Sequence, residues 1–173
     1  MESAVKLVAD LMAISAKTAP KGLGKDYVEI KILTGDDVKK LGETMIQMAK
    51  ERNEQGFTRD GKNVLESSAV LLLGLRDHPP NGVDCAGCGF LCEEMKVRHL
   101  EGDFVGPNCV FRLLDLGIAI GSAVKTASIH NVDNRVMYRV GVAARKAGFI
   151  NSRVVIGIPL SATTKSVYFD RKQ

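Results

Sequence analysis

The sequence contains no tryptophan, and its 173 residues include only three tyrosines and six phenylalanines. So few aromatic side chains offer little surface on which nucleic-acid bases could stack, which argues against a single-strand binder. The chain also lacks a large excess of one charge, because 24 basic residues face 20 acidic ones and leave a net charge of +4. A charge this small and dispersed predicts no nucleic-acid partner. A hydrophobic content of 45% is too high for a disordered chain.

Long hydrophobic runs are missing as well. The longest apolar stretch, residues 110–124, contains Arg112 and Asp115 and is too short to cross about 30 Å of hydrocarbon. The first apolar stretch carries Lys6 and Asp10, so it lacks the order of a signal peptide. We therefore expect a cytoplasmic protein with no membrane partner. In that compartment four cysteines are expected to be metal ligands or redox groups rather than disulfides.

Motifs for nucleotide binding and hydrolysis are absent from the sequence. Gly22–Lys25 lacks the spacing of a phosphate-binding loop, and Ser122 lacks the glycine that a nucleophile elbow needs two residues earlier. The three histidines lie in a proline-rich loop (His78), among the cysteines (His99) and at a helix end (His130). We expect them to be structural, with His99 as a spare ligand.

Hydrophobic periodicity predicts an alternation of helices and strands. Helices are expected over residues 3–16, 34–53, 107–130 and 132–147, and strands over residues 28–33, 70–75 and 153–159. The last two strands are continuous apolar runs, which is typical of strands covered on both faces. The pattern predicts a single α/β (α+β) domain, residues 1–173, with helices on both faces of a sheet. In the 107–130 helix, Gly117 and Gly121 would let another backbone approach, either within one subunit or in the core of a homodimer.

All four cysteines fall in one short segment, as Cys85, Cys88, Cys92 and Cys109 in the pattern C-x2-C-x3-C-x16-C. Three close thiols and one distant thiol are a common ferredoxin-like arrangement, and four thiolates complete the ligation of an iron–sulfur cluster. Gly87 and Gly89 would let backbone N–H groups approach the sulfurs. Cys92 and Cys109 are expected at helix N-termini, whose free N–H groups favour an anionic cofactor. Lys96, Arg98 and Arg112 would add positive charge, although a solvated surface explains them equally well.

Three interpretations of this constellation compete. The first is an iron–sulfur cluster held by all four cysteines. The second is a structural zinc site with four thiolate ligands, although zinc ribbons usually pair two C-x2-C knuckles and this chain has one. The third is a redox-active dithiol of Cys85 and Cys88 with two further buried thiols. The iron–sulfur interpretation is favoured.

The cysteine motif reads Asp-Cys-Ala-Gly-Cys-Gly-Phe-Leu-Cys and is followed later by Asn-Cys. It lies between two further motifs, Thr-Ala-Pro-Lys-Gly and Ile-Gly-Ile-Pro-Leu-Ser-Ala. This arrangement resembles a bacterial and archaeal family of uncharacterised ferredoxin-domain-containing proteins over nearly the whole chain. The resemblance implies a ferredoxin-like module of residues 84–109 inserted into the domain. The cysteine stretch also resembles the [4Fe–4S] module of some electron-transport and corrinoid proteins, but it is one residue shorter between the second and third cysteines. A [4Fe–4S] cluster is therefore favoured, and a [2Fe–2S] cluster stays open.

A second resemblance is to the nitroreductase-like flavoproteins. It is carried by Ala19-Pro20-Lys21 in a loop after the first helix, the strand from Val28, and Gly157-Ile-Pro159 near the end with basic residues after it. The resemblance implies an obligate dimer with FMN at the subunit interface. The paired arginines that those enzymes carry before the first long helix are absent. If the fold joins this loop to the tail, an FMN phosphate would be held by basic residues of both, and the candidates are Lys21, Lys25, Lys165 and Arg171.

The sequence thus predicts an iron–sulfur redox protein that exchanges electrons with a partner protein. It leaves open whether the chain is an enzyme, in which case it would be an FMN-containing oxidoreductase. The alternative is a non-enzymatic module in which a four-cysteine zinc site stabilises a loop that binds another protein.

Overall fold

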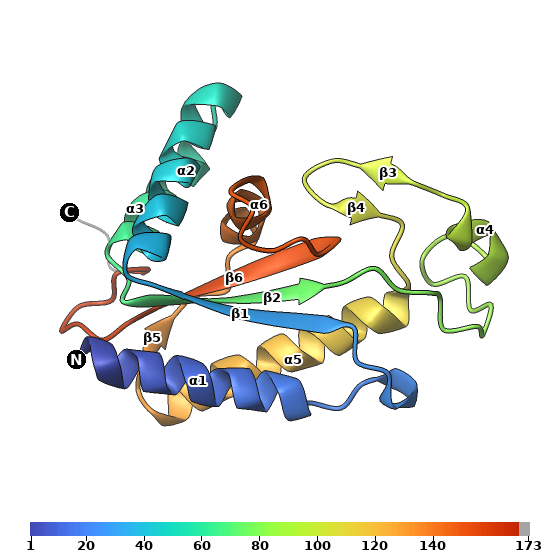
Figure 1. The fold of residues 1–173 in the computed structure, drawn as a ribbon, viewed down its shortest axis with the longest axis horizontal. Helices are drawn as coiled ribbons and strands as arrows, with labels where there is room; N and C mark the ends of the chain where they lie inside the picture. Colours follow the sequence, from blue (N-terminus) through green and yellow to red (C-terminus); the bar gives the residue numbers. More distant parts are fainter. Residues whose placement is uncertain (170–173) are drawn as a thin grey trace.

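The main sheet has four antiparallel strands in the order β1-β2-β6-β5 (Figure 1). The structure is a computed structural model that describes residues 1–169. The strands of the main sheet are β1 (Val28–Thr34), β2 (Ala69–Leu75), β5 (Asp133–Asn134) and β6 (Val154–Ser161). A separate hairpin pairs β3 (Leu100–Glu101) with β4 (Val105–Gly106).

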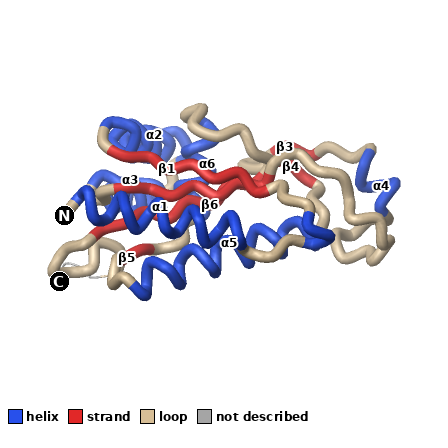
Figure 2. The backbone as a smooth tube through the Cα atoms, turned by 60° about the horizontal axis from the view of Figure 1, so that its bottom comes forward, coloured by secondary structure: helices blue, strands red, loops and turns tan. Residues whose placement is uncertain are grey.

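Helices cover both faces of this sheet, as the sequence predicted (Figures 1 and 2). One face is covered by α1 (Glu2–Thr18) and α5 (Val110–Ile129). The opposite face is covered by α2 (Asp36–Arg52), α3 (Gln55–Leu65) and α6 (Tyr138–Lys146). Two short helices, η1 (Gly22–Gly24) and α4 (Cys92–Lys96), lie in connections. No helix among residues 1–169 combines the length and the apolar character that crossing a membrane would need.

The two central strands account for the two apolar runs of the sequence. Every residue of β2 is buried, because successive side chains of a strand point to opposite faces and both faces are covered. Leu71 and Leu73 pack in the core beneath α1 and α5, whereas Val70 and Leu72 pack in the core beneath α2 and α6. The sheet therefore separates two hydrophobic cores.

Some elements differ from the sequence expectations. Helix α3 was not predicted, and the beginning of the expected 132–147 helix forms the edge strand β5. Helix α5 begins at Val110 with Cys109 as its N-cap, so Pro107 lies before the helix rather than in its first turn. Tyr168, near the end of the described residues, is buried in the molecule's own core.

Residues 76–109, which we call the cysteine segment, leave the sheet after β2 and return at α5. They project from the end of the sheet opposite to the N-terminus (Figure 1). Arg153, just before β6, forms hydrogen bonds with residues near both ends of the cysteine segment. Its guanidinium donates to Asp77 Oδ1 at 2.9 Å, to Asn108 Oδ1 at 3.0 Å and to the Pro107 carbonyl at 3.0 Å. The base of the cysteine segment is thereby tied to the sheet.

Candidate functional site: the cysteine segment and its base

The four cysteines differ strongly in burial. Cys85 is exposed, Cys88 and Cys92 are half-buried, and Cys109 is buried. All four are free thiols. Cys92 is the first residue of α4, and Cys109 caps α5, so two of the four lie at helix N-termini as expected. The chemistry of this donor set suits an iron–sulfur cluster, which is held by four cysteine thiolates.

Among residues 1–169, no three histidine, cysteine or acidic side chains converge in a geometry that could hold one metal ion. In a single-ion zinc site each sulfur lies about 2.3 Å from the same ion. In an iron–sulfur cluster each thiolate binds its iron within a larger inorganic core, so the sulfurs stand further apart. Metal ligation by Cys85, Cys88, Cys92 and Cys109 stays a prediction.

The turn that carries the first two cysteines lies directly on α5. A Cβ at Gly87 would lie 2.8 Å from Val110 Cγ1 and 3.5 Å from Cys85 Sγ. A contact of 2.8 Å is too short, so only glycine fits while the turn keeps this position. The turn bearing Cys85 is therefore packed against the residue that follows Cys109.

The backbone N–H groups of two cysteines are already engaged by side chains. The N–H of Cys92 donates to Asp84 Oδ1 at 2.8 Å, and the N–H of Cys109 donates to His78 Nε2 at 3.2 Å. The helix N-termini were expected to offer free N–H groups to an anionic cofactor, but these two N–H groups are bound by side chains. Polar side chains near the start of each helix satisfy them instead.

His78 is bound at both ring nitrogens. Because the Cys109 N–H can only donate, Nε2 is the acceptor, and the ring proton belongs on Nδ1, which lies 2.9 Å from the Arg76 carbonyl. Burial, together with the positive charges of Arg153 and Arg112, lowers the pKa of His78. His78 is thus held as a neutral imidazole that supports the N-cap of α5, a structural role that agrees with the sequence expectation.

Arg112 is the largest fully buried side chain, with 1% of its surface exposed. Its Nη1 donates to the Gly22 carbonyl at 2.9 Å and to Asp115 Oδ2 at 3.1 Å, and its Nη2 donates to Asn81 Oδ1 at 3.1 Å. The guanidinium also lies 4.9 Å from the centre of the Tyr27 ring. The alternative of a solvated Arg112 is therefore wrong.

The remaining charged groups of the cysteine segment lie at the surface. Lys96 pairs with Glu93, and Arg98 stacks over Phe90 at 5.1 Å. His99 lies 3.6 Å from Glu101 and is exposed. Sequence reasoning missed Arg112, Asp115 and Asn81 as a cluster, although two charges inside the most apolar helix were a visible signal.

Of the proposed phosphate residues, the three that the structure describes (Lys21, Lys25 and Lys165) are not brought together within one chain. We call residues 19–26 the lysine loop. Lys21 Nζ caps the end of α1 by donating to the carbonyls of Ala16, Ala19 and Lys17, at 2.7, 2.8 and 2.9 Å. Lys25 is exposed and lies in the same loop. Arg171 lies outside the described residues.

Strand register explains why Lys165 is distant from this loop. The lysine loop precedes Val28, which pairs with Leu75, and Leu75 pairs with Val154 at the beginning of β6. Lys165 follows the opposite end of β6, where Leu160 pairs with Ala69. The lysine loop and residues 162–165 therefore lie at opposite ends of one sheet (Figure 1). These residues do not fit an FMN phosphate within a single chain.

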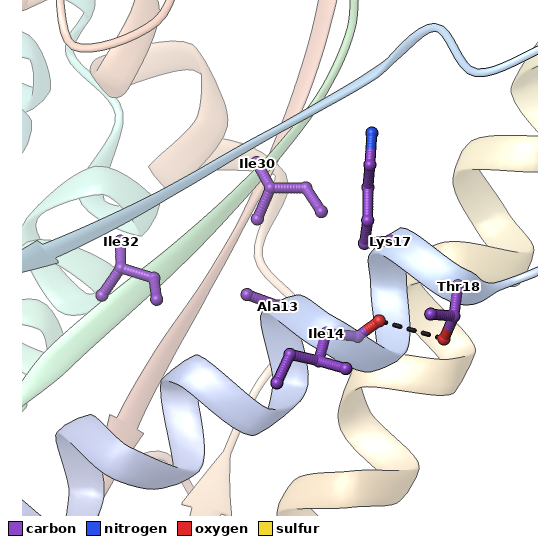
Figure 3. A pocket seen from close by; sticks show the side chains of 6 residues that line it. All are labelled: Ala13, Ile14, Lys17, Thr18, Ile30 and Ile32. Atoms are coloured by element: carbon purple, nitrogen blue, oxygen red, sulfur yellow. Dashed lines mark hydrogen bonds between the residues drawn. The ribbon is translucent and has the colours of Figure 1, made fainter.

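Two apolar hollows flank the main body. One, of about 560 Å³, lies beside the cysteine segment and is lined by Leu100, Phe104 and Leu113 among others. The other, of about 420 Å³, lies between α1 and the edge strand β1, and Ile14, Ile30 and Ile32 are among the residues that line it (Figure 3). Of the two, only the first is lined by residues of the cysteine segment.

Comparison with known sequences supports a redox assignment. The chain is 48% identical over 169 residues to an uncharacterized protein of Archaeoglobus fulgidus, a match that spans 96% of this chain and 91% of the relative. The family model "Uncharacterized protein containing a ferredoxin domain" (DUF2148) matches residues 105–171, which include Cys109. These matches confirm the family resemblance predicted from the cysteine motif.

Solved structures with a similar fold include nitroreductases. The FMN-dependent nitroreductase NfnB of Mycobacterium smegmatis has a TM-score of 0.62 and 11% identity over 92% of this chain and 78% of that chain. A nitroreductase of Desulfitobacterium hafniense with bound FMN has a TM-score of 0.59 and 12% identity over the same shares. At these identities the similarity establishes the fold. The ferredoxin domain that names the family points to a redox role, and the chain belongs to the family of uncharacterized proteins containing a ferredoxin domain (DUF2148), with a nitroreductase-like fold.

Proposed function

We propose that this protein is an iron–sulfur electron-transfer protein whose cluster is held by Cys85, Cys88, Cys92 and Cys109. The observation that carries the proposal is the gathering of four free thiols on one segment that projects from a nitroreductase-like body. The ferredoxin-domain family agrees with it. When bound, such a cluster supplies one-electron transfer at a potential set by burial, charge and hydrogen bonds to sulfur.

The residues around the thiols have distinct tasks in this proposal. Gly87 seats the first cysteine turn on α5, and His78 holds the N-cap at Cys109. Arg153 anchors both stems of the segment to the sheet. Exposed Cys85 lies where a redox partner protein could approach, whereas buried Cys109 lies toward the body.

A homodimer formed through α5 is part of the proposal. The outer face of this helix exposes Leu113, Leu114 and Ile118, and a Cβ at Gly117 or Gly121 would meet no atom within 4 Å. Close packing among the described residues of one subunit therefore does not require a glycine at either position. An apolar face of this kind is typical of protein–protein contacts.

FMN binding would require that dimer. Within one chain the lysine loop and the tail lie at opposite ends of the sheet, so Lys25 of one copy and Lys165 of a second copy would have to meet at the interface. The solved nitroreductase of Desulfitobacterium hafniense contains FMN, which motivates an assay for flavin.

Anaerobic purification followed by a visible spectrum and assays of iron, sulfide, zinc and flavin tests the proposal. We expect broad absorption near roughly 400 nm and bound iron and sulfide, both lost in Cys88→Ser. A colourless protein that contains one zinc per chain, and that loses stability without any redox signal in Cys88→Ser, would establish the structural zinc alternative instead.

A further inference from the structure

We infer that Arg112 is a positioning residue that holds the cysteine segment against the lysine loop. Three parts of the chain that are distant in sequence meet at its guanidinium. They are the lysine loop through Gly22, the cysteine segment through Asn81, and the first turns of α5 through Asp115. Cys109 lies one turn before Arg112 on the same helix, and the Arg112 N–H donates to the Cys109 carbonyl at 3.0 Å.

Asp115 completes the junction on the side of the lysine loop. Its Oδ2 accepts from Arg112, while its Oδ1 accepts the Gly22 N–H at 2.8 Å. Gly22 is thus bound through both its N–H and its carbonyl, by two side chains that are themselves buried. A planar guanidinium can make these divergent contacts at once, whereas a lysine ammonium cannot reproduce their geometry.

The energetics favour positioning over stability as the role of Arg112. A fully buried charged pair recovers little more than its desolvation cost, and apolar side chains of similar volume often serve stability as well. Within the described part of the chain, Arg112 Nε is buried without a hydrogen-bond partner, which adds to the cost. What the arginine supplies, and an apolar residue could not, is directional contact with two separate loops.

The consequence for electron transfer rests on the proposed function. If the cysteines hold a cluster and the lysine loop takes part in a second site, Arg112 sets the spacing between the two. The positioning itself is a property of the chain without cofactors, so it can be tested separately.

The test measures how fast each thiol reacts with N-ethylmaleimide in metal-free, reduced protein, resolved by peptide mass spectrometry. Asn81→Ala removes only the link to the cysteine segment and leaves the Arg112–Asp115 pair. We expect the labelling rate of buried Cys109 to rise about tenfold in this variant, with a melting temperature close to that of the wild type. Trypsin cleavage after Lys25 should be unchanged.

Arg112→Gln removes both links, so faster labelling of Cys109 should be accompanied by faster cleavage after Lys25. Arg112→Lys should not restore the slow rates. Arg139→Gln is the matched control, because Arg139 forms an ion pair with a buried aspartate, Asp60, at 3.2 Å on the other face of the sheet. It should change neither rate.

If Cys109 is labelled in Asn81→Ala at the same rate as in the wild type, the inference is overturned. This variant decides the question even if Arg112→Gln does not fold. A Cys109 rate that rises equally in Arg139→Gln would also overturn it, since general destabilisation would then explain the effect. Wild-type protein without iron after anaerobic purification would refute the proposed function and leave the labelling result standing.

Discussion

At the scale of single residues, the base of the cysteine segment is built from polar groups that are buried and bound. His78 forms hydrogen bonds through both ring nitrogens as a neutral imidazole. The Arg112 guanidinium donates to a carbonyl oxygen and a carboxylate. Burial of such groups is tolerated only when they are hydrogen-bonded. The sequence shows that these residues exist, but their partners lie 2 to 90 positions away and depend on the fold.

Gly87→Ala tests the packing of the turn that carries Cys85 and Cys88 against α5. The added methyl group would clash with Val110, a stiff β-branched side chain, so we expect a loss of about 1–3 kcal/mol in the free energy of unfolding and a lower iron content. Thermal unfolding and iron analysis measure both. Gly102→Ala is the control, because its Cβ would meet only one atom, at 4.0 Å. Equal losses in the two variants would contradict the assignment.

Asp103 carries a testable pH dependence. Its carboxylate accepts hydrogen bonds from Arg52 and Tyr138, and the bond from Arg52 is the main reason that its pKa is lowered from 3.8. The stabilisation is therefore present above pH 3.8 and is lost as pH falls through the folded-state pKa. We expect Asp103→Asn to cost about 1 kcal/mol at neutral pH and progressively less below pH 3.8.

Denaturant unfolding of the wild type and Asp103→Asn across pH 2.5–7 measures this difference. Asp10→Asn, which breaks the exposed Lys6–Asp10 pair, serves as the control and should cost only a few tenths of a kcal/mol. A cost for Asp103→Asn that stays constant down to pH 2.5 would exclude the carboxylate as its source.

At the scale of elements, amphipathic and fully apolar patterns predicted most of the body. The stripe Val38, Leu41, Met45 and Met48 is buried in α2, and the apolar runs became the central strands β2 and β6. The errors fall where apolar residues are few or where a strand is very short. Helix α3 has few apolar residues, and β5 is a two-residue edge strand whose pairing with β6 depends on a distant part of the chain.

The contact between α6 and β6 depends on Gly141. A Cβ there would lie 1.7 Å from the Val155 carbonyl oxygen, which is backbone and cannot rotate away. We expect Gly141→Ala to cost about 3 kcal/mol or more, measured by denaturant unfolding. Gly117→Ala on α5 meets nothing within 4 Å, so in a monomer it should stabilise the helix by about 0.5–1 kcal/mol. A stable Gly141→Ala protein would show that α6 can move away from the sheet.

At the scale of the whole molecule, sheet order decides which sites form. The antiparallel register sends the lysine loop and Lys165 to opposite ends of the sheet, so among the described residues one chain does not assemble the phosphate site that the sequence suggested. The same register brings the lysine loop to the end from which the cysteine segment projects, and Arg112 joins them there.

The proposed dimer gives a prediction at this scale. Ile118→Glu places a charge on the exposed face of α5 and should convert the protein to a monomer, measured by light scattering, with a melting temperature that no longer depends on concentration. Ile14→Glu on α1 is a matched change of an exposed isoleucine beside the other apolar groove. If Ile14→Glu dissociates the dimer and Ile118→Glu does not, the interface lies at that groove.

Sequence alone determined the alternation of helices and buried strands, the identity of the four thiols and the family, because each is written in local spacing and residue type. Only the tertiary structure decided that the lysines of loop and tail stay apart, that Arg112 is buried between two loops, and that His78 supports Cys109. These relations depend on strand order and register, which join residues far apart in the chain through contacts that no local pattern specifies.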